Sequence, residues 1–273
     1  IMKGSDCMLT NGNTRIKRLS YHFRKHYQLY LLLLPAILFF AVFCYWPMYG
    51  VQIAFKDFTA RLGIWGSKWV GLKHFQRFFR APSFWSLIIN SLSISLYTLI
   101  AGFPMPIILA LIINEIRSTR YKKFFQTLTY APHFISAIVM VSMLYIFLGP
   151  EGIINRTITS LGGKTISFMS DSGLFRSVYV WSGIWQNAGW NSIIYLSALA
   201  GIDPGLHESA MIDGASRFQR IWHVNIPGII PTAVIMFILQ VGSFMSIGFE
   251  KIYLMQNPLN LATSEVITTY VYK

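Results

Sequence analysis

Polar side chains inside a long apolar stretch are the first candidates for a binding site. Residues 177–202 contain no charged residue, yet an indole and three amides recur there at helical spacing from Gly183: Gln186, Asn187, Trp190 and Asn191. Amides hydrogen-bond to hydroxyl groups, and an indole face can stack on a sugar ring. This stripe, with Gln240 and Ser243 on a later stretch, predicts a pathway for a hydroxyl-rich ligand. The alternative is hydrogen bonding between helices.

Catalytic chemistry has less support than binding. The ten acidic residues are scattered singly, and no His, Cys and Asp cluster has the spacing of a metal site. The sequence contains no phosphate-binding loop of the Gly-rich Lys-Ser/Thr type, so the chain itself shows no motif for ATP hydrolysis. We therefore predict no catalytic residue, no metal site and no cofactor. Two other functions stay open: a proton-coupled secondary transporter and a membrane-embedded glycosyl- or phosphotransferase.

Proton coupling would need an ionisable relay inside the membrane. The apolar stretches contain no acid, and His133 follows Pro132 with no carboxylate nearby in the sequence. A histidine without such a partner is better explained by packing than by proton transfer.

A second segment of interest, residues 203–227, separates two apolar stretches. Asp203 as N-cap and Pro204 at the first helical position predict a short helix, which Gly214 interrupts before a second amphipathic turn. Apolar side chains protrude from both parts: Ala210, Met211, Phe218, Ile221 and Trp222. Such an elbow predicts a docking surface for a partner protein. The alternative is an ordinary helical hairpin.

The elements that position these residues are membrane-spanning helices. The chain is 54% hydrophobic and only 12% charged, far from the composition of a soluble domain. Five charge-free stretches each exceed the roughly 20 residues that cross a bilayer; they are 29–55, 81–114, 124–150, 177–202 and 224–249. The fold class is therefore an all-α, multi-pass transmembrane bundle. Prolines within these stretches predict kinks rather than helix ends; they are Pro35, Pro47, Pro104, Pro106, Pro132 and Pro231.

The positions of the charged residues divide the chain into a tail, a first helix, a surface segment and a core domain. There are 23 Lys and Arg residues against 10 Asp and Glu, and they lie in short interruptions that suit lipid headgroups and form no nucleic-acid motif. A basic tail, 1–28, precedes the first helix at 29–55, and the cluster from Arg15 to Lys25 favours a cytoplasmic N-terminus. Residues 56–80 interleave aromatic and basic side chains, which predicts an extracytoplasmic segment at the membrane surface. It serves either as an anchor or as a docking site. Residues 81–273 form the core domain.

The segment 203–227 resembles the EAA loop of ABC importer permeases, through which a permease couples to its ATPase. The matching residues are Glu208, Ser209, Ala210, Asp213, Gly214, Ala215 and Pro227. Ser209 stands where the motif has Ala, and Val224 stands where it has Ile.

Further motifs are similar to the LplB-like branch of carbohydrate-uptake permeases; they include 47–50, 69–72, 132–136 and 189–196. This resemblance implies a bacterial cell-membrane subunit that forms half of a pathway for an oligosaccharide or polysaccharide fragment. It also implies a second homologous permease as heterodimer partner, a cytoplasmic ATPase dimer that binds ATP and Mg, and an extracytoplasmic solute-binding protein. The family has six spans, so a sixth is expected beyond Lys273.

Overall fold

The computed structural model describes residues 26–273. Most of the predicted basic tail, including the cluster from Arg15 to Lys25, lies outside the described residues. The chain divides into two compact units, residues 1–81 and 82–273, and each is described by itself.

The first unit begins with one continuous helical stretch. It consists of α2 (Tyr27–Phe40), the π-helical η1 (Ala41–Tyr45), α3 (Trp46–Met48) and the 3-10 helix η2 (Tyr49–Phe55). The π-helical turn ends two residues before Pro47, whose ring has no N–H and crowds the carbonyl one turn earlier. None of these helical segments contains a buried residue. A helix that is apolar on all sides and buries nothing within its own unit suits a lipid or helix environment.

A small hairpin follows this helical stretch. Strand β1 (Lys56–Asp57) pairs antiparallel with β2 (Lys68–Trp69), α4 (Gly63–Gly66) lies between them, and α5 (Lys73–Phe79) comes after. The Phe55 ring stacks on Trp69 at 5.7 Å between centroids and also contacts Phe75 at 5.3 Å. Trp65 is 83% exposed. Residues 56–80 thus combine a hairpin with the short helix α5.

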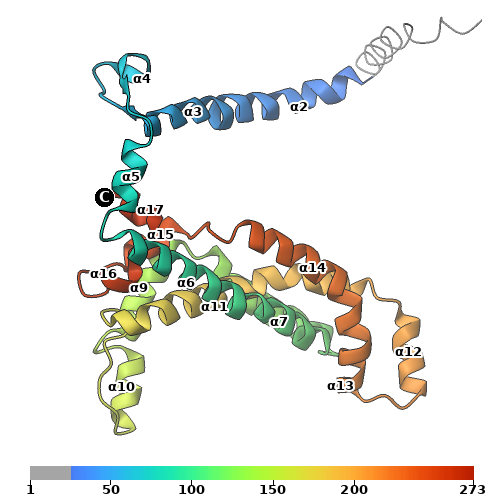
Figure 1. Cartoon of the computed structure of the whole chain (residues 1–273). Coiled ribbons are helices and arrows are strands. Elements are labelled where there is room, and N and C mark those ends of the chain that lie inside the picture. Colours follow the sequence, from blue (N-terminus) through green and yellow to red (C-terminus); the bar gives the residue numbers. More distant parts are fainter. Residues whose placement is uncertain (1–25) are drawn as a thin grey trace, which may run out of the picture. The chain divides into compact units, whose positions relative to one another are not determined.

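The second unit is a helical bundle built around α11 (Ser172–Ala200), which packs against α6, α7, α8, α14 and α16 (Figure 1). The helical elements of this unit besides α11 are α6 (Phe84–Gly102), α7 (Pro104–Asn114), α8 (Thr119–Tyr130), η3 (Ala131–Phe134), α9 (Ala137–Leu148), α10 (Ile153–Ser160), α12 (Pro204–Ile212), α13 (Arg217–Arg220), η4 (Ile221–Asn225), α14 (Ile226–Gly242), α15 (Phe249–Met255), α16 (Leu261–Ser264) and α17 (Ile267–Tyr272).

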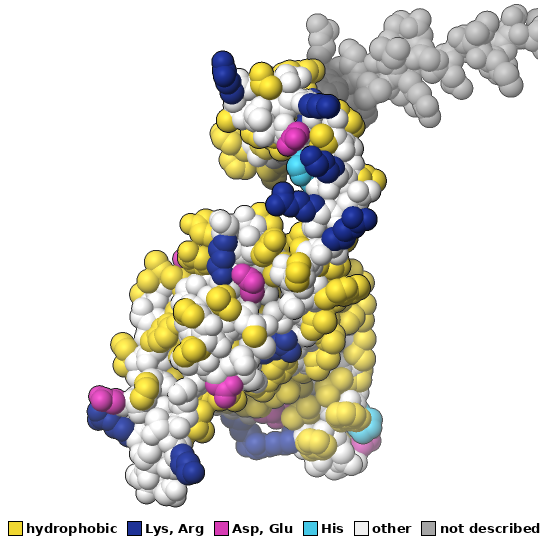
Figure 2. Space-filling model, turned by 60° about the vertical axis from the view of Figure 1, so that its left-hand side comes forward, with side chains coloured by type: hydrophobic (Ala, Val, Ile, Leu, Met, Phe, Trp, Pro, Cys, Tyr) yellow, Lys and Arg dark blue, Asp and Glu magenta, His cyan; other side chains and the backbone are white. Residues whose placement is uncertain are grey.

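Four helical stretches among the described residues are long and apolar enough to cross a membrane: Tyr27–Phe55, Phe84–Asn114, Ala137–Ser160 and Arg217–Gly242. The fifth predicted span, α11, is long enough at 29 residues but carries amides and glycines. It also contacts more helices of the unit than its neighbours do, so part of its polar surface packs against other helices. Hydrophobic side chains cover much of the face of this unit in Figure 2, with few charges among them.

The third predicted stretch, 124–150, is interrupted rather than kinked, which corrects the expectation for Pro132. Helix α8 ends at Tyr130, η3 follows, and α9 begins at Ala137. Pro132 lies in the first turn of η3, and Ser136 is extended with its hydroxyl accepting the N–H of Val139. A new N-cap therefore restarts the helix. Pro35 and Pro231 lie inside continuous helices as predicted.

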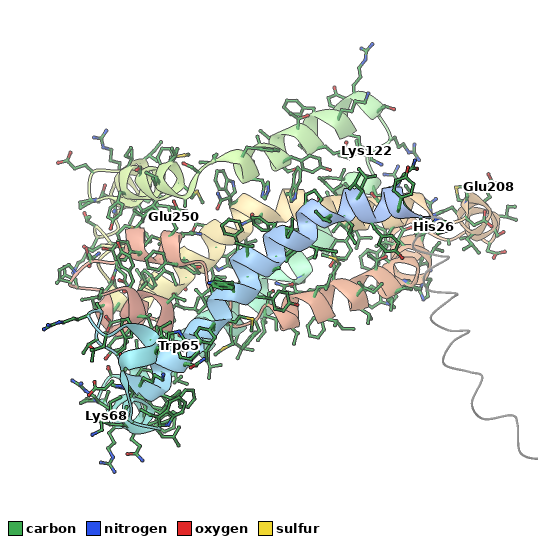
Figure 3. The ribbon with its side chains drawn as sticks, turned by 90° about the horizontal axis from the view of Figure 1, so that it is seen from above. His26, Trp65, Lys68, Lys122, Glu208 and Glu250 are labelled. Atoms are coloured by element: carbon green, nitrogen blue, oxygen red, sulfur yellow. The ribbon has the colours of Figure 1, made fainter. Side chains whose placement is uncertain are left out.

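Two apolar clusters lie at different levels along α11. Phe175, near its first turn, packs with Ile94, Ile252, Met255 and other buried side chains. Tyr195, Leu196 and Leu199, near its last turns, pack with Ala110 and Ile229. The polar middle of α11 lies between these clusters. Figure 3 shows Lys122 and Glu208 at one end of the unit and Glu250 at the other.

Candidate functional site

A cavity of about 290 Å³ opens beside the polar middle of α11. Side chains from α6, α7, α11, α14 and α15 line it; they include Thr98, Pro106, Tyr179, Gln186, Asn187, Asn191, Gln240 and Lys251. Four of the six residues predicted for the pathway therefore share one cavity: Gln186, Asn187, Asn191 and Gln240. Its size approaches that of small-molecule pockets, which begin at about 300 Å³.

The three amides of α11 differ in their partners. Gln186 Nε2 donates to the carbonyl of Ile135 at 2.8 Å, in the break between η3 and α9. Asn187 Nδ2 donates to Gly183 at 3.0 Å, and its Oδ1 lies 3.0 Å from His133 Nδ1. Asn191 is exposed and has no hydrogen-bond partner within the described part of the chain. Its amide is therefore the one most available to a ligand.

Trp190 contacts η3 and does not line this cavity. Its ring is stacked on His133 at 4.7 Å with an interplanar angle of 4°, and Phe134 meets it edge-on at 5.5 Å. The indole is still 41% exposed. His133 thus has both a hydrogen bond and a stacking partner, which agrees with a packing role.

Gln240 also lines a second cavity of about 160 Å³, together with Ser243, Thr98 and Tyr179. The hydroxyl of Ser243 donates to carbonyls of its own helix, those of Leu239 and Gln240. The two cavities share Thr98, Tyr179 and Gln240 in their linings, so they are neighbours.

Lys251 is a cavity residue that the sequence analysis missed. It lies on α15, just beyond the last predicted stretch, and its Nζ donates to the carbonyl of Tyr179 at 3.0 Å. The same nitrogen lies 4.8 Å from the centroid of the Tyr179 ring. Burial lowers the pKa of the Lys251 ammonium to about 8, so it is still mostly protonated at neutral pH. Lys251 is a single lysine in a short segment beyond a predicted span, so no periodic pattern in the sequence could indicate that it lines the cavity.

The segment 203–227 forms the predicted elbow. The Asp203 side chain accepts the N–H of Gly205, Pro204 opens α12, and Gly214 has φ of +79°. The elbow resumes at Ser216, whose side chain forms a capping box with Gln219. The second part differs from the predicted separate turn, because α13 and η4 run on into α14 as one helix.

The apolar side chains of this elbow face outward. Those exposed by half or more are Leu206, Met211, Ile212, Phe218 and Trp222. Ile212, at 87%, is the most exposed and was not among the predicted ones, whereas Ala210 and Ile221 are partly buried. Glu208, Ser209, Asp213 and Gly214 are exposed beside them. An apolar patch of this kind indicates an interaction surface.

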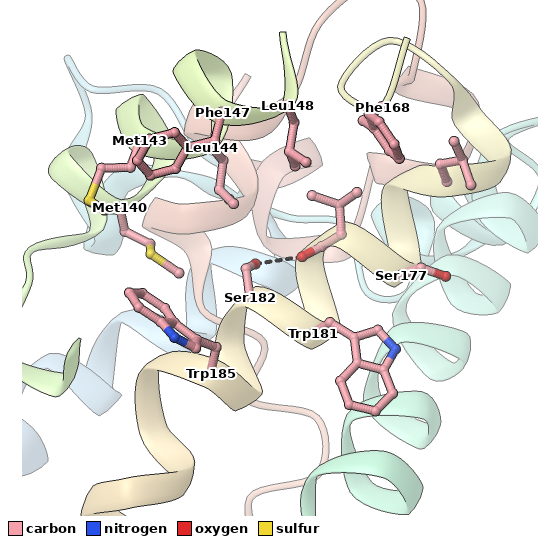
Figure 4. A pocket seen from close by; sticks show the side chains of 12 residues that line it. Met140, Met143, Leu144, Phe147, Leu148, Phe168, Ser177, Trp181, Ser182 and Trp185 are labelled. Carbon is pink, nitrogen blue, oxygen red and sulfur yellow. Dashed lines mark hydrogen bonds between the residues drawn. The ribbon is translucent and has the colours of Figure 1, made fainter. Parts of the chain in front are cut away.

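A groove of about 450 Å³ separates α9 from α11 (Figure 4). Met140 and Phe147 line it from α9, and Trp181 and Trp185 line it from α11. Its lining is mostly apolar, and the hydroxyl of Ser182 donates to its own helix at Val178. This lining suits an apolar neighbour and not a sugar.

Residues 102–273, which hold most of the cavity lining and the elbow, match the family model described as "Binding-protein-dependent transport system inner membrane component". The chain belongs to this family. It is a multi-pass transport permease subunit of an ABC system. No cofactor is expected of such a subunit.

Individual relatives of this permease agree with that assignment. Protein LplB of Bacillus subtilis (strain 168) is 46% identical over 89% of this chain and 77% of its own length. The polygalacturonan/rhamnogalacturonan transport system permease protein YteP of the same organism is 44% identical over 94% of this chain and 80% of its own.

A solved structure is also similar. It is that of a bacterial ABC transporter involved in the import of the acidic polysaccharide alginate, with a TM-score of 0.85 and 39% identity, covering 93% of this chain and 86% of that one. The same transporter in complex with an alginate pentasaccharide-bound periplasmic protein also gives a TM-score of 0.85.

Proposed function

We propose that this permease forms half of the translocation pathway for an oligosaccharide or polysaccharide fragment. The observation that carries the proposal is the polar cavity beside α11, where Asn191 offers a free amide between two apolar clusters. The Asn191 amide is exposed and has no hydrogen-bond partner within the described part of the chain, so the hydroxyl groups of a passing sugar can bind to it. The polysaccharide substrates named for YteP and the alginate transporter support this substrate class.

The remaining components of the importer would be a second homologous permease, a cytoplasmic ATPase dimer that binds ATP and Mg, and an extracytoplasmic solute-binding protein. The exposed apolar side chains of the elbow provide the surface for the ATPase. The motif residues Glu208, Ser209, Ala210, Asp213, Gly214 and Ala215 lie at or near its bend, and Pro227 lies in the first turn of α14. In this arrangement the N-terminus and the elbow are cytoplasmic, and α15 to α17 lie at the extracytoplasmic end. Glu208 and Glu250 lie at opposite ends of the unit in Figure 3, so this arrangement places the two segments on opposite sides of the membrane.

The difference between Asn191 and Asn187 gives a test of the pathway. We expect Asn191→Ala to lower oligosaccharide uptake by about tenfold, because a sugar hydroxyl then loses a hydrogen bond worth roughly 1–3 kcal/mol. The melting temperature in detergent should stay unchanged. Asn187→Ala removes an interhelical bond to His133, worth about 0.6 kcal/mol, and should lower the melting temperature slightly.

Uptake would be measured in proteoliposomes that hold the complete importer, with basal ATP hydrolysis as the control for folding. A wild-type rate of uptake for Asn191→Ala would show that the sugar passes elsewhere, for example along the partner permease.

A further inference from the structure

The ammonium of Lys251 is the one charged group among the cavity-lining residues in the described part of the chain. It donates one hydrogen bond, to the carbonyl of Tyr179, although an ammonium has three donors. The ion pairs found among the described residues are Lys73 with Asp57 and Lys273 with Glu265, and neither involves Lys251. No carboxylate lines the cavity within the described part of the chain. A half-buried cation without an acid partner costs free energy, and within a membrane protein such a residue commonly marks a substrate pathway.

The surroundings of Lys251 leave its nitrogen open to a ligand. Nζ lies against α11, over the Tyr179 ring and beside Gly183, where an added Cβ would be only 3.3 Å from it. The absence of a side chain at Gly183 therefore keeps space beside the ammonium. The amides of Asn191 and Gln240 line the same cavity, so a ligand there meets one positive charge and several neutral hydrogen-bonding groups. This combination fits a sugar that carries both hydroxyls and a carboxylate.

We propose that Lys251 binds a carboxylate of the passing saccharide, so that the substrate is an oligosaccharide containing uronic acid residues. The two free N–H groups of the ammonium would donate to the carboxylate oxygens while the amides contact hydroxyls. The inference rests on the proposed function, because it places the acidic sugar in the cavity assigned to translocation.

The test compares trigalacturonate with its methyl ester, which has the same backbone but no charge. Uptake of each is measured in proteoliposomes holding the complete importer, with the wild-type permease, Lys251→Met and Lys251→Arg. We expect the wild type to prefer trigalacturonate. Lys251→Met should lower uptake of trigalacturonate by about tenfold, the effect of losing one charged hydrogen bond, and leave uptake of the ester unchanged. Lys251→Arg should keep the preference.

Two further variants separate a role of Lys251 in binding the carboxylate from a role in holding the helices together. Lys164→Met removes an exposed lysine from the loop before α11 and should change neither substrate. Gly183→Val keeps the charge but crowds the ammonium, and should reduce the preference for the acid even where Lys251→Met folds poorly.

Three results would contradict the inference, and each has a different meaning. An equal loss of both substrates in Lys251→Met would mean that the lysine only anchors α15 to α11, and this would overturn the inference. If the wild-type permease takes up the ester but not trigalacturonate, the inference is overturned and the proposed function is supported. Uptake of neither saccharide would overturn the inference, and the proposed function would then be tested with a neutral oligosaccharide in the same proteoliposomes.

Discussion

Gly214→Val is expected to abolish sugar uptake while the importer still assembles and hydrolyses ATP. Gly214 lies at the bend of the elbow with φ of +79°, a conformation that a β-branched residue adopts only at a cost of about 1–2 kcal/mol. An added Cβ meets no atom within 4 Å. The effect therefore comes from the backbone, which must move away from the bend and carry the exposed side chains of α12 with it. Uptake and ATP hydrolysis in the same proteoliposomes measure the coupling.

Gly214→Asn is the matched control. Asn is close to Val in size but tolerates a positive φ, so it should retain most of the uptake. If Asn abolishes transport as fully as Val does, the surface at this position matters and its backbone conformation does not. Wild-type uptake by Gly214→Val would contradict the coupling role of the bend.

The largest loss of stability is expected for Gly189→Val. Helices α8 and α11 approach so closely there that a Cβ on Gly189 would lie 2.0 Å from the carbonyl oxygen of Thr129. Backbone atoms cannot rotate away as a flexible side chain can, so the two helices must separate. Overpacking of this kind costs about 3 kcal/mol or more. We expect little folded protein and a strongly lowered melting temperature in detergent.

Gly242→Ala provides the comparison. Gly242 ends α14, and a Cβ added there would meet no atom within 4 Å, so this change should be neutral or slightly stabilising. A Gly189→Val protein that melts like the wild type would show that α8 and α11 do not pack as closely as described.

The sequence predicts those parts of the fold that depend on local rules. Absence of charge locates the apolar helices, and Asp203 with Pro204 locates the start of α12 because capping needs only neighbouring residues. The bend at Gly214 is likewise a local property of glycine. The amides of α11 have helical periodicity, so the order of the residues alone indicates that they share one face.

Features that depend on tertiary contacts are not predictable in this way. The break before α9 has the local N-cap Ser136, but it also coincides with a hydrogen bond from Gln186 to Ile135, 51 positions apart in the chain, and no local pattern indicates that contact. Lys251 joins the cavity only because α15 packs beside α11. The stacking of Trp190 on His133 also involves two separate helical elements, so the stripe on α11 could not reveal which of its members face the cavity.

The most direct test of the account is whether the elbow contacts the cytoplasmic ATPase. Ser209 is exposed on α12, and Ser209→Cys would be made in a chain whose own cysteines, Cys7 and Cys44, are replaced by Ser and Ala. A membrane-impermeant thiol reagent is applied to sealed vesicles of either orientation, with and without the ATPase subunit. The account predicts labelling from the cytoplasmic side only, and loss of that labelling when the ATPase is bound. Labelling from the outer side, or cytoplasmic labelling that the ATPase leaves unchanged, would contradict it.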